Sequence, residues 1–446
     1  MAEHSSWRPR LAGLSLLAAS LLGAPAAVLA QQDTAALSLA ELIERALQNS
    51  PVQGLADRGL ALAQAQRDIS RGALLPQLDL QAMQARQTSN PAAMGFEFPG
   101  LPELIGPFSV FDARVRLSQK LLDLSTMSEV SSRNFAVDAA RAQVEVQREQ
   151  LAAQVAVSFI RVLAGEQALE SAKADLALAE DLLVQARDQR QAGVAAGVDV
   201  SRSETAVAQD RYAVSEAQTA MAQSRLQLQR LASLPMGQAI VLSGDLKADG
   251  SLAPGADDAL AVARSDRADL ALVQAQLKQA EAALQAARRR VLPTVSAFAD
   301  YGLSANTPNK NEQDTYRYGA QIQMPLYAGG AVSAGKAAAE LQVEQQRLRL
   351  DDLREQIEQD VRLAVVTVAN TREQMAAAEA ALAFAERELE LARDRFLNGI
   401  ANNVDVVTAQ ANLARARTQV VSAQAAYQQA RVNLASAQGH ARQFRL

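Results

Sequence analysis

The sequence of 446 residues contains no cysteine, and it has only two histidines and one tryptophan. Without cysteine the chain has no disulfide, no thiolate metal ligand, no cysteine nucleophile and no cysteine that a lipid could modify. His440 is the only histidine after the first 30 residues, and the single tryptophan, Trp7, lies within them. Because catalytic and metal sites draw heavily on histidine and cysteine, this inventory predicts no enzyme, no cofactor and no metal site.

Long apolar runs are missing beyond the N-terminus. The first 30 residues join Arg8 and Arg10 to the apolar run LAGLSLLAASLLGAPAA and end at Ala30, which predicts a secretory signal peptide over 1–30 rather than a membrane anchor. No later run of about 18 apolar residues predicts a membrane-spanning helix. Removing the signal changes the net charge from −5 to −6, so nucleic acid is not an expected partner. The one dense basic run, Arg288–Arg290, is explained by a helix C-terminus.

Short signals recur in the same order in the two halves of the chain. AGVAAGVDV from Ala192 is similar to NGIANNVDV from Asn398, ALLPQLDL to RVLPTVSA, and LSQKLLDLS to IQMPLYAGG. A duplicated unit of about 200 residues explains this order. We therefore predict a first repeat at 31–233, an inter-repeat linker at 234–256 and a second repeat at 257–446.

Each predicted repeat contains segments in which apolar and polar residues alternate. SVFDARVRLSQKL, TVSAFADYGLSA and TYRYGAQIQMPL alternate clearly and QLDLQAMQA more weakly, which predicts β-hairpins at 76–123 and 293–327. These two spans hold nine of the 17 aromatic residues. Strands of about 10 residues with one apolar face and aromatic ends are typical of outer-membrane barrels. A small soluble sheet packed on helices is the alternative.

The remaining sequence is rich in Ala, Gln, Arg and Glu and poor in Pro and Gly. It predicts very long helices at 125–190 and 331–397, each roughly 100 Å long. Shorter helices are predicted at 39–74, 200–231, 258–291 and 404–437. Small alanines on rods of this length favour coiled-coil-like packing.

Four strands cannot close a barrel, since single-chain membrane barrels begin at about eight strands. In lipid, an open sheet edge would leave backbone groups without hydrogen bonds. If these strands enter a membrane, several chains must pool them, so the sequence predicts an obligate oligomer.

Taken in order, each half is a helix, a strand after Leu-Pro, a hairpin, a very long helix, and a VDV turn into a closing helix. This order resembles the TolC-like outer-membrane efflux protein family over almost the whole mature chain, most closely in QMPLYAGG and RFLNGIANNVDVV. The resemblance implies an α+β membrane protein whose helices run antiparallel. It also implies a homotrimer, with a 12-stranded outer-membrane barrel on a 12-helix periplasmic tunnel.

The family resemblance implies a passive exit duct of a tripartite efflux or type I secretion system. Its partners would be outer-membrane lipid, a periplasmic adaptor (membrane fusion) protein and an inner-membrane pump. Drugs, metals, solvents and polypeptides are all compatible cargoes. A soluble periplasmic coiled-coil adaptor or structural protein is the alternative. An exported hydrolase is not favoured, because the sequence offers no candidate nucleophile or metal cluster.

The resemblance also assigns the repeated turn to the periplasmic entrance. The candidates for the adaptor-docking tip are Gly193, Val194, Gly399 and Ile400. The candidates for the entrance constriction are Asp405, Asp199 and Thr408. Capping chemistry is the alternative, because a glycine that ends one helix and an aspartate that begins the next are common helix signals.

Several positions depart from the family pattern. Thr408 and Arg202 stand where a second acidic residue is expected in each half, which implies one acidic ring per trimer. Phe396 and Ala401 stand where the entrance latch has an aromatic hydroxyl and a base, so the latch must differ or be weaker.

Other motifs are explained without chemistry. GAVSAGKA, at Gly330–Ala337, is similar to a phosphate-binding loop, but Ala337 replaces the Ser or Thr that would hold Mg²⁺. We therefore interpret it as the turn from strand into helix. The acidic pairs Asp257–Asp258 and Asp351–Asp352 are interpreted as solvated helix surface.

Overall fold

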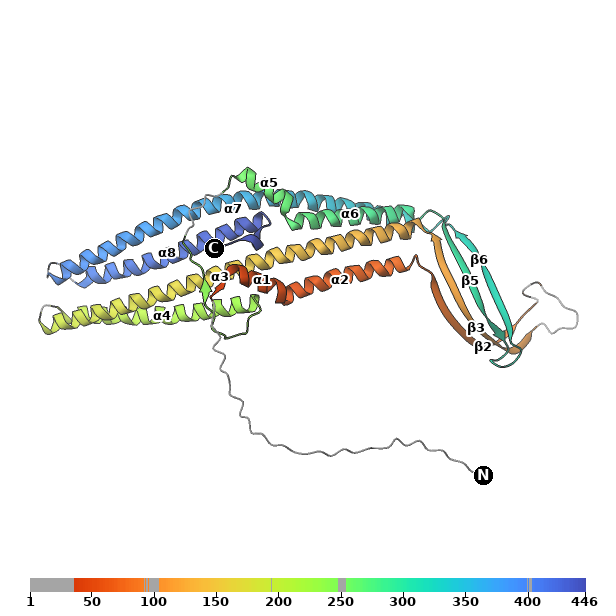
Figure 1. Ribbon diagram of the computed structural model, residues 1–446, viewed down its shortest axis with the longest axis horizontal. Helices are drawn as coiled ribbons and strands as arrows, with labels where there is room; N and C mark the ends of the chain where they lie inside the picture. The colour runs from red at the N-terminus through yellow and green to blue at the C-terminus, as the bar shows by residue number, and fades with distance from the viewer. Residues whose placement is uncertain are drawn as a thin grey trace, which may run out of the picture. The chain divides into compact units, whose positions relative to one another are not determined.

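The computed structural model describes residues 36–91, 93, 95, 104–193, 195–247, 254–398, 400 and 403–446 (Figure 1). Ala36–Leu446 forms one compact unit. The predicted signal peptide at 1–30 lies outside the described residues. None of the described helices is both long enough and apolar enough to span a membrane.

Two very long helices dominate this unit, as the sequence predicts. They are α3 (Leu124–Gln191) and α7 (Ala331–Leu397). Each turns into a shorter antiparallel partner, α4 (Gly197–Leu231) or α8 (Asn403–Ala437). Figure 1 shows the resulting α3–α4 and α7–α8 hairpins running side by side, with both turns at the end away from the sheet.

The other two predicted helices are each split in two, so their predicted continuity was wrong. The segments are α1 (Leu39–Asn49), α2 (Pro51–Gly72), α5 (Ala256–Asp266) and α6 (Ala268–Arg289). Ser50 is extended because the following proline disfavours a helical residue before it, and its hydroxyl accepts a hydrogen bond from the Val52 amide. Arg267 is extended at the second break, where its guanidinium binds Asp269 and Asp360.

The four predicted strands form one antiparallel sheet in the order β2-β3-β5-β6. The strands are β2 (Gln77–Ser89), β3 (Ile105–Leu122), β5 (Thr294–Ala305) and β6 (Gln313–Gln323). Both hairpins are confirmed, including the strand with the weaker alternation. Pairing between β3 and β5 joins the two hairpins into a single sheet.

The sheet has one apolar and one polar face, because side chains alternate along every strand. Leu80, Val115 and Tyr301 follow one another across β2, β3 and β5 on the apolar face. This face is open to its surroundings in the described part of the chain, and Leu80 is 79% exposed. On the polar face the Asp300 carboxylate is buried between the guanidinium groups of Arg114 and Arg317.

The largest apolar core surrounds the middle of α3. Phe159 on that helix packs with Leu42 of α1, Leu228 of α4, Leu246 of the linker and Phe444 near the C-terminus. The short parallel pair of β1 (Leu37–Ser38) with β4 (Leu242–Ser243), which the sequence does not predict, and the turn η2 (Ala441–Gln443) lie beside this core. The linker and both ends of the described chain are therefore anchored half-way along the long helices.

Candidate functional site

The first candidate turn joins α3 to α4 and depends on one glycine. Gly193 has a φ of +77°, a left-handed conformation that side chains with a Cβ disfavour, and its amide donates to the Arg190 carbonyl at 3.1 Å. The Ala195 amide reaches back to the Gln189 carbonyl at 3.3 Å, which closes the end of α3. Gly193 is exposed, with open space where a Cβ would lie. Val194 lies outside the described residues.

Asp199 lies in the first turn of α4. Its carboxylate accepts hydrogen bonds from the Ala196 amide at 3.1 Å and from the Arg202 guanidinium at 3.2 Å. Arg202, which occupies the position where the family pattern expects a second acid, therefore pairs with the first one. These contacts stabilise the start of α4 and partly neutralise Asp199.

The second candidate turn joins α7 to α8. The Asn398 side chain donates to the Asp394 carbonyl at 2.7 Å, and the Ile400 amide donates to the Arg395 carbonyl at 2.9 Å. Ile400 is 70% exposed. Asp405 and Thr408, at the start of α8, are also exposed. Gly399, a tip candidate, and Ala401, a latch position, lie outside the described residues.

The two turns lie beside each other because Asn403 joins them. Its buried side-chain amide donates to the Asp199 carbonyl oxygen at 3.0 Å and to the Ser203 hydroxyl at 3.2 Å. The two regions that carry Asp199 and Asp405, 206 residues apart in sequence, are thus brought together at one end of the hairpins.

Asn403 is the first of three polar residues that α8 presents to the α3–α4 hairpin. Gln410 donates to Asp210 of α4 at 3.2 Å, and Arg417 forms an ion pair with the buried Asp175 of α3. Asn403, Gln410 and Arg417 are seven residues apart, and this spacing keeps them on one side of a helix in a coiled coil. We call these three residues and their partners the polar ladder.

Apolar packing supports the same end of the hairpins. Phe396 of α7 is buried against Val406 and Leu413 of α8, and Leu182 of α3 belongs to the same cluster. The residue that lacks the expected latch hydroxyl is therefore part of the apolar core at this end of the hairpins. The polar ladder adds side-chain hydrogen bonds between the two hairpins in this region.

Two carboxylates of the polar ladder are harder to ionise than usual. Burial raises the pKa of Asp175, although the Arg417 guanidinium opposes the rise. Burial and the nearby Asp175 charge both raise the pKa of Asp210. One guanidinium and one amide thus hold two carboxylates that lie close enough to repel each other.

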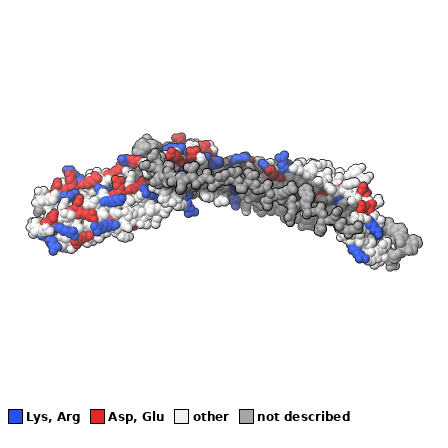
Figure 2. All heavy atoms as spheres, turned by 60° about the horizontal axis from the view of Figure 1, so that its bottom comes forward, with Lys and Arg blue, Asp and Glu red and all other residues white. Residues whose placement is uncertain are grey.

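Charged side chains are dense around this end of the protein. Figure 2 shows positive and negative side chains intermixed over the end that the α3–α4 and α7–α8 hairpins form. Many belong to exposed pairs that join neighbouring helices, such as Arg187 with Glu204 and Arg211 with Glu180. Exposed pairs of this kind contribute little stability, and both of these lie within the α3–α4 hairpin, whereas the polar ladder joins that hairpin to α8.

Sequence reasoning found the two turns but missed the polar ladder. Its signal was the recurrence of Asn403, Gln410 and Arg417 every seven residues, within a helix whose other core positions are mostly Ala, Val and Leu. Polar residues are so frequent in α8 that this spacing is visible only when one knows which side faces the partner hairpin.

Sequence comparison gives two matches to one family. Residues 42–233 and 259–440 both match the sequence model of the family described as "Outer membrane efflux protein". The outer membrane protein TolC of Vibrio cholerae serotype O1 is 24% identical over 393 residues, which cover 84% of each protein. The proteases secretion protein PrtF of Dickeya chrysanthemi is 31% identical over 131 residues, which cover 29% of this chain and 28% of that protein.

The fold is similar to that of a solved outer-membrane channel. CmeC of Campylobacter jejuni superposes with a TM-score of 0.77 at 17% identity, over 90% of this chain and 86% of that one. The likeness therefore extends over most of the chain.

Proposed function

This chain belongs to the outer membrane efflux protein family and is an outer-membrane exit duct, and we propose that three copies close together into one channel. Three four-stranded sheets would form a 12-stranded barrel, and the helices below would form a 12-helix periplasmic tunnel. The duct would catalyse no reaction, and an inner-membrane pump and a periplasmic adaptor would supply its cargo.

The sheet carries this proposal. Its apolar face is uncovered, and within the described sheet the outer strands β2 and β6 each pair with a single neighbour. The apolar face is costly to expose to water, and the open edges are costly in lipid, where their backbone groups find no hydrogen-bond partner. Pairing β6 of each copy with β2 of the next removes the open edges. A soluble coiled-coil spacer, the alternative function, has no use for an exposed apolar sheet.

The two hairpin turns would bind the adaptor. Gly193 and Ile400 are exposed at neighbouring turns, and three copies would present six such turns in a ring. Relatives named for protease secretion and for antibiotic efflux make both polypeptides and small molecules candidate cargoes.

Asp405 would form an acidic ring at the entrance of this trimer. It is exposed at the start of α8, where the helix dipole favours a negative charge. A ring of carboxylates around a narrow pore attracts cations and holds multivalent ones longest.

The first experiment is single-channel conductance of the purified protein in a planar bilayer. We expect small, cation-selective steps that di- or trivalent cations block, and Asp405→Ala should weaken that block by roughly tenfold or more. Asp352→Ala, which removes an exposed acid from the side of α7, is the matched control and should leave the block unchanged. An unaltered block in Asp405→Ala would remove this residue from the gate.

A further inference from the structure

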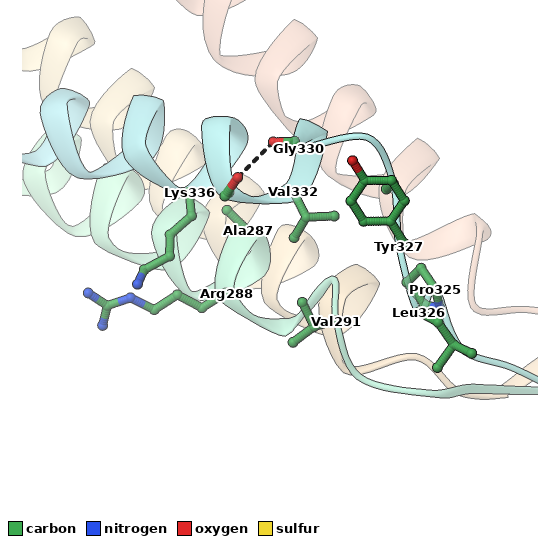
Figure 3. Close-up of a pocket in the computed structure, with 11 residues that line it drawn as sticks. Ala287, Arg288, Val291, Pro325, Leu326, Tyr327, Gly330, Val332 and Lys336 are labelled. Carbon is green, nitrogen blue, oxygen red and sulfur yellow. Dashed lines mark hydrogen bonds between the residues drawn. The ribbon is translucent and has the colours of Figure 1, made fainter.

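A cavity of about 560 Å³ lies where the sheet meets the helices, and nothing in the duct mechanism uses it. It is formed by the end of α6, the segment that leaves β6 and the first turns of α7 (Figure 3). Two motifs that the sequence explains as local helix and turn signals meet here. Arg288 belongs to the Arg288–Arg290 run, and Lys336 is the lysine of GAVSAGKA.

The two ends of the cavity differ in chemistry. Val291, Pro325, Leu326, Tyr327 and Val332 form its apolar wall. Arg288 and Lys336 lie together at the other end, and Figure 3 shows both side chains reaching away from the apolar wall. The cavity thus places an apolar surface beside two cations. Such a site can bind an anionic amphiphile, with the apolar part on the wall and the anionic part at the cations.

The cationic end carries a net positive charge. Arg288 and Lys336 share one carboxylate, since both bind Oε1 of Glu340, at 3.0 and 3.8 Å. Both side chains remain about half exposed, so a further anion can reach them. A guanidinium and an ammonium side by side suit a phosphate group.

The apolar end continues the apolar face of the sheet. Along β6 and beyond it, Ile322, Met324 and Leu326 are alternate residues, and all three are exposed. Leu326 and Tyr327 are each 89% exposed, and a tyrosine at this level is typical of a membrane interface. The cations therefore lie just beyond the end of the apolar band, at the level of lipid headgroups.

A second copy of the chain is a poorer occupant. The cavity lies between α6 and α7, below the paired strands β5 and β6, and not at an open edge of the sheet. A neighbour that pairs with β6 would meet the edge of that strand that faces away from β5.

We propose that this cavity binds an anionic phospholipid of the periplasmic leaflet, with its phosphate between Arg288 and Lys336 and the start of an acyl chain on Val291 and Leu326. The inference rests on the outer-membrane location of the chain. It is independent of whether or how the duct conducts. Bound lipid would fix the height of the sheet relative to the helices.

Native mass spectrometry of the detergent-purified, delipidated protein tests the site. Added phosphatidylglycerol should saturate at about one tightly bound lipid per chain and bind more tightly than zwitterionic phosphatidylcholine. Arg288→Gln with Lys336→Gln should weaken phosphatidylglycerol binding by about 10- to 30-fold, since each cation near a headgroup contributes roughly a factor of five. Arg354→Gln with Arg387→Gln, which removes two exposed cations elsewhere on α7, should change nothing.

A second variant and a second ligand make the test decisive. Leu326→Ser should weaken lipid binding while keeping the preference for phosphatidylglycerol, because it alters only the apolar wall. Equal binding of both lipids, or unchanged binding by the Arg288/Lys336 variant, would overturn the proposal. Displacement of the lipid by millimolar inorganic phosphate would make free phosphate the ligand, and dissociation of the Arg288/Lys336 variant into monomers would make a second copy the occupant.

Discussion

At the residue scale, the polar ladder combines one buried ion pair with hydrogen bonds donated by neutral side-chain amides. The Arg417 guanidinium stabilises the buried Asp175, whereas Asp210 accepts a hydrogen bond from the neutral amide of Gln410. A buried ion pair is costly to break because the remaining charge has no solvent. The ladder can therefore hold the two hairpins in one register without adding much to their stability.

The raised pKa of Asp210 predicts how stability depends on pH. In the folded protein this carboxylate keeps its proton to a higher pH than in the unfolded chain, because of burial and Asp175. Between the unfolded and folded pKa values the folded state binds more protons, so the contribution of Asp210 to stability falls as pH rises. Asp210→Asn should therefore stabilise the protein, increasingly so from about pH 4 towards neutrality.

Thermal unfolding followed by circular dichroism at several pH values measures this effect. The gain in Tm of Asp210→Asn over wild type should grow with pH, while the new amide oxygen still accepts the hydrogen bond from Gln410. Glu216→Gln, an exposed change on the same helix, provides the control. A gain that is constant with pH would show that Asp210 is not a destabilising charge.

At the scale of elements, the sequence predicts what depends on local pattern and misses what depends on packing. The bounds of α7 match the prediction, because Gly330 and Asn398 punctuate a long run of helix-forming residues. The break at Arg267 could not be predicted, since one of the two carboxylates that bind its guanidinium is Asp360 on α7, which is adjacent only after folding.

The candidate site likewise contains features that the local sequence predicts and contacts that only packing reveals. Gly193 and the acid at the start of each closing helix are local signals, and the repeat makes them visible. The partners of Asn403 are a carbonyl and a hydroxyl about 200 residues away, which no local pattern indicates. The cavity between α6 and α7 could not be predicted from the sequence either, because Arg288 precedes the β5–β6 hairpin and Lys336 follows it.

Gly302 in β5 gives a prediction for the sheet. A Cβ at this position would lie 2.3 Å from the Ala113 carbonyl oxygen and 2.6 Å from the Arg114 Cα, so the backbone of β3 would have to move. Gly302→Ala should destabilise the sheet by about 1–3 kcal/mol or more. It should also lower the amount of assembled protein in the outer membrane.

The matched control is the same substitution in a helix. Gly59 lies inside α2, where a Cβ would meet open space within 4 Å, and Gly59→Ala should stabilise that helix by about 0.5–1 kcal/mol. Denaturation of the two purified variants, together with their yield from membranes, compares them directly. Equal stability of both variants would mean that β3 and β5 are not as closely paired as the structure shows.

At the scale of the whole molecule, a single chain leaves the apolar face and the two outer strands of its sheet uncovered in the described structure. The apolar core lies around the middle of α3, while the described sheet is a single layer whose apolar face is uncovered. Lipid can cover the apolar face, but it cannot satisfy the outer backbone groups of β2 and β6. Assembly is therefore required for the sheet more than for the helices.

Cross-linking between the two outer strands tests the assembly. The chain has no cysteine, so Gln77→Cys at the start of β2 and Gln323→Cys at the end of β6 would introduce the only thiols. Both positions lie at the end of the sheet nearest the helices, and in a closed ring β6 of one copy meets β2 of the next. A short thiol-specific cross-linker applied to membranes should give dimers and trimers and nothing larger.

The control pairs Gln77→Cys with Thr294→Cys, which lies on the inner strand β5 and should give no cross-link between copies. Monomers alone from the first pair would contradict closure through these edges, and a ladder beyond three would contradict the trimer. Three is the number that the family resemblance implies, since three copies would give 12 strands and six helical hairpins, whereas two copies would give eight strands and four hairpins. A product that ends at the trimer would thus establish that the exit duct is a property of the assembly rather than of one chain.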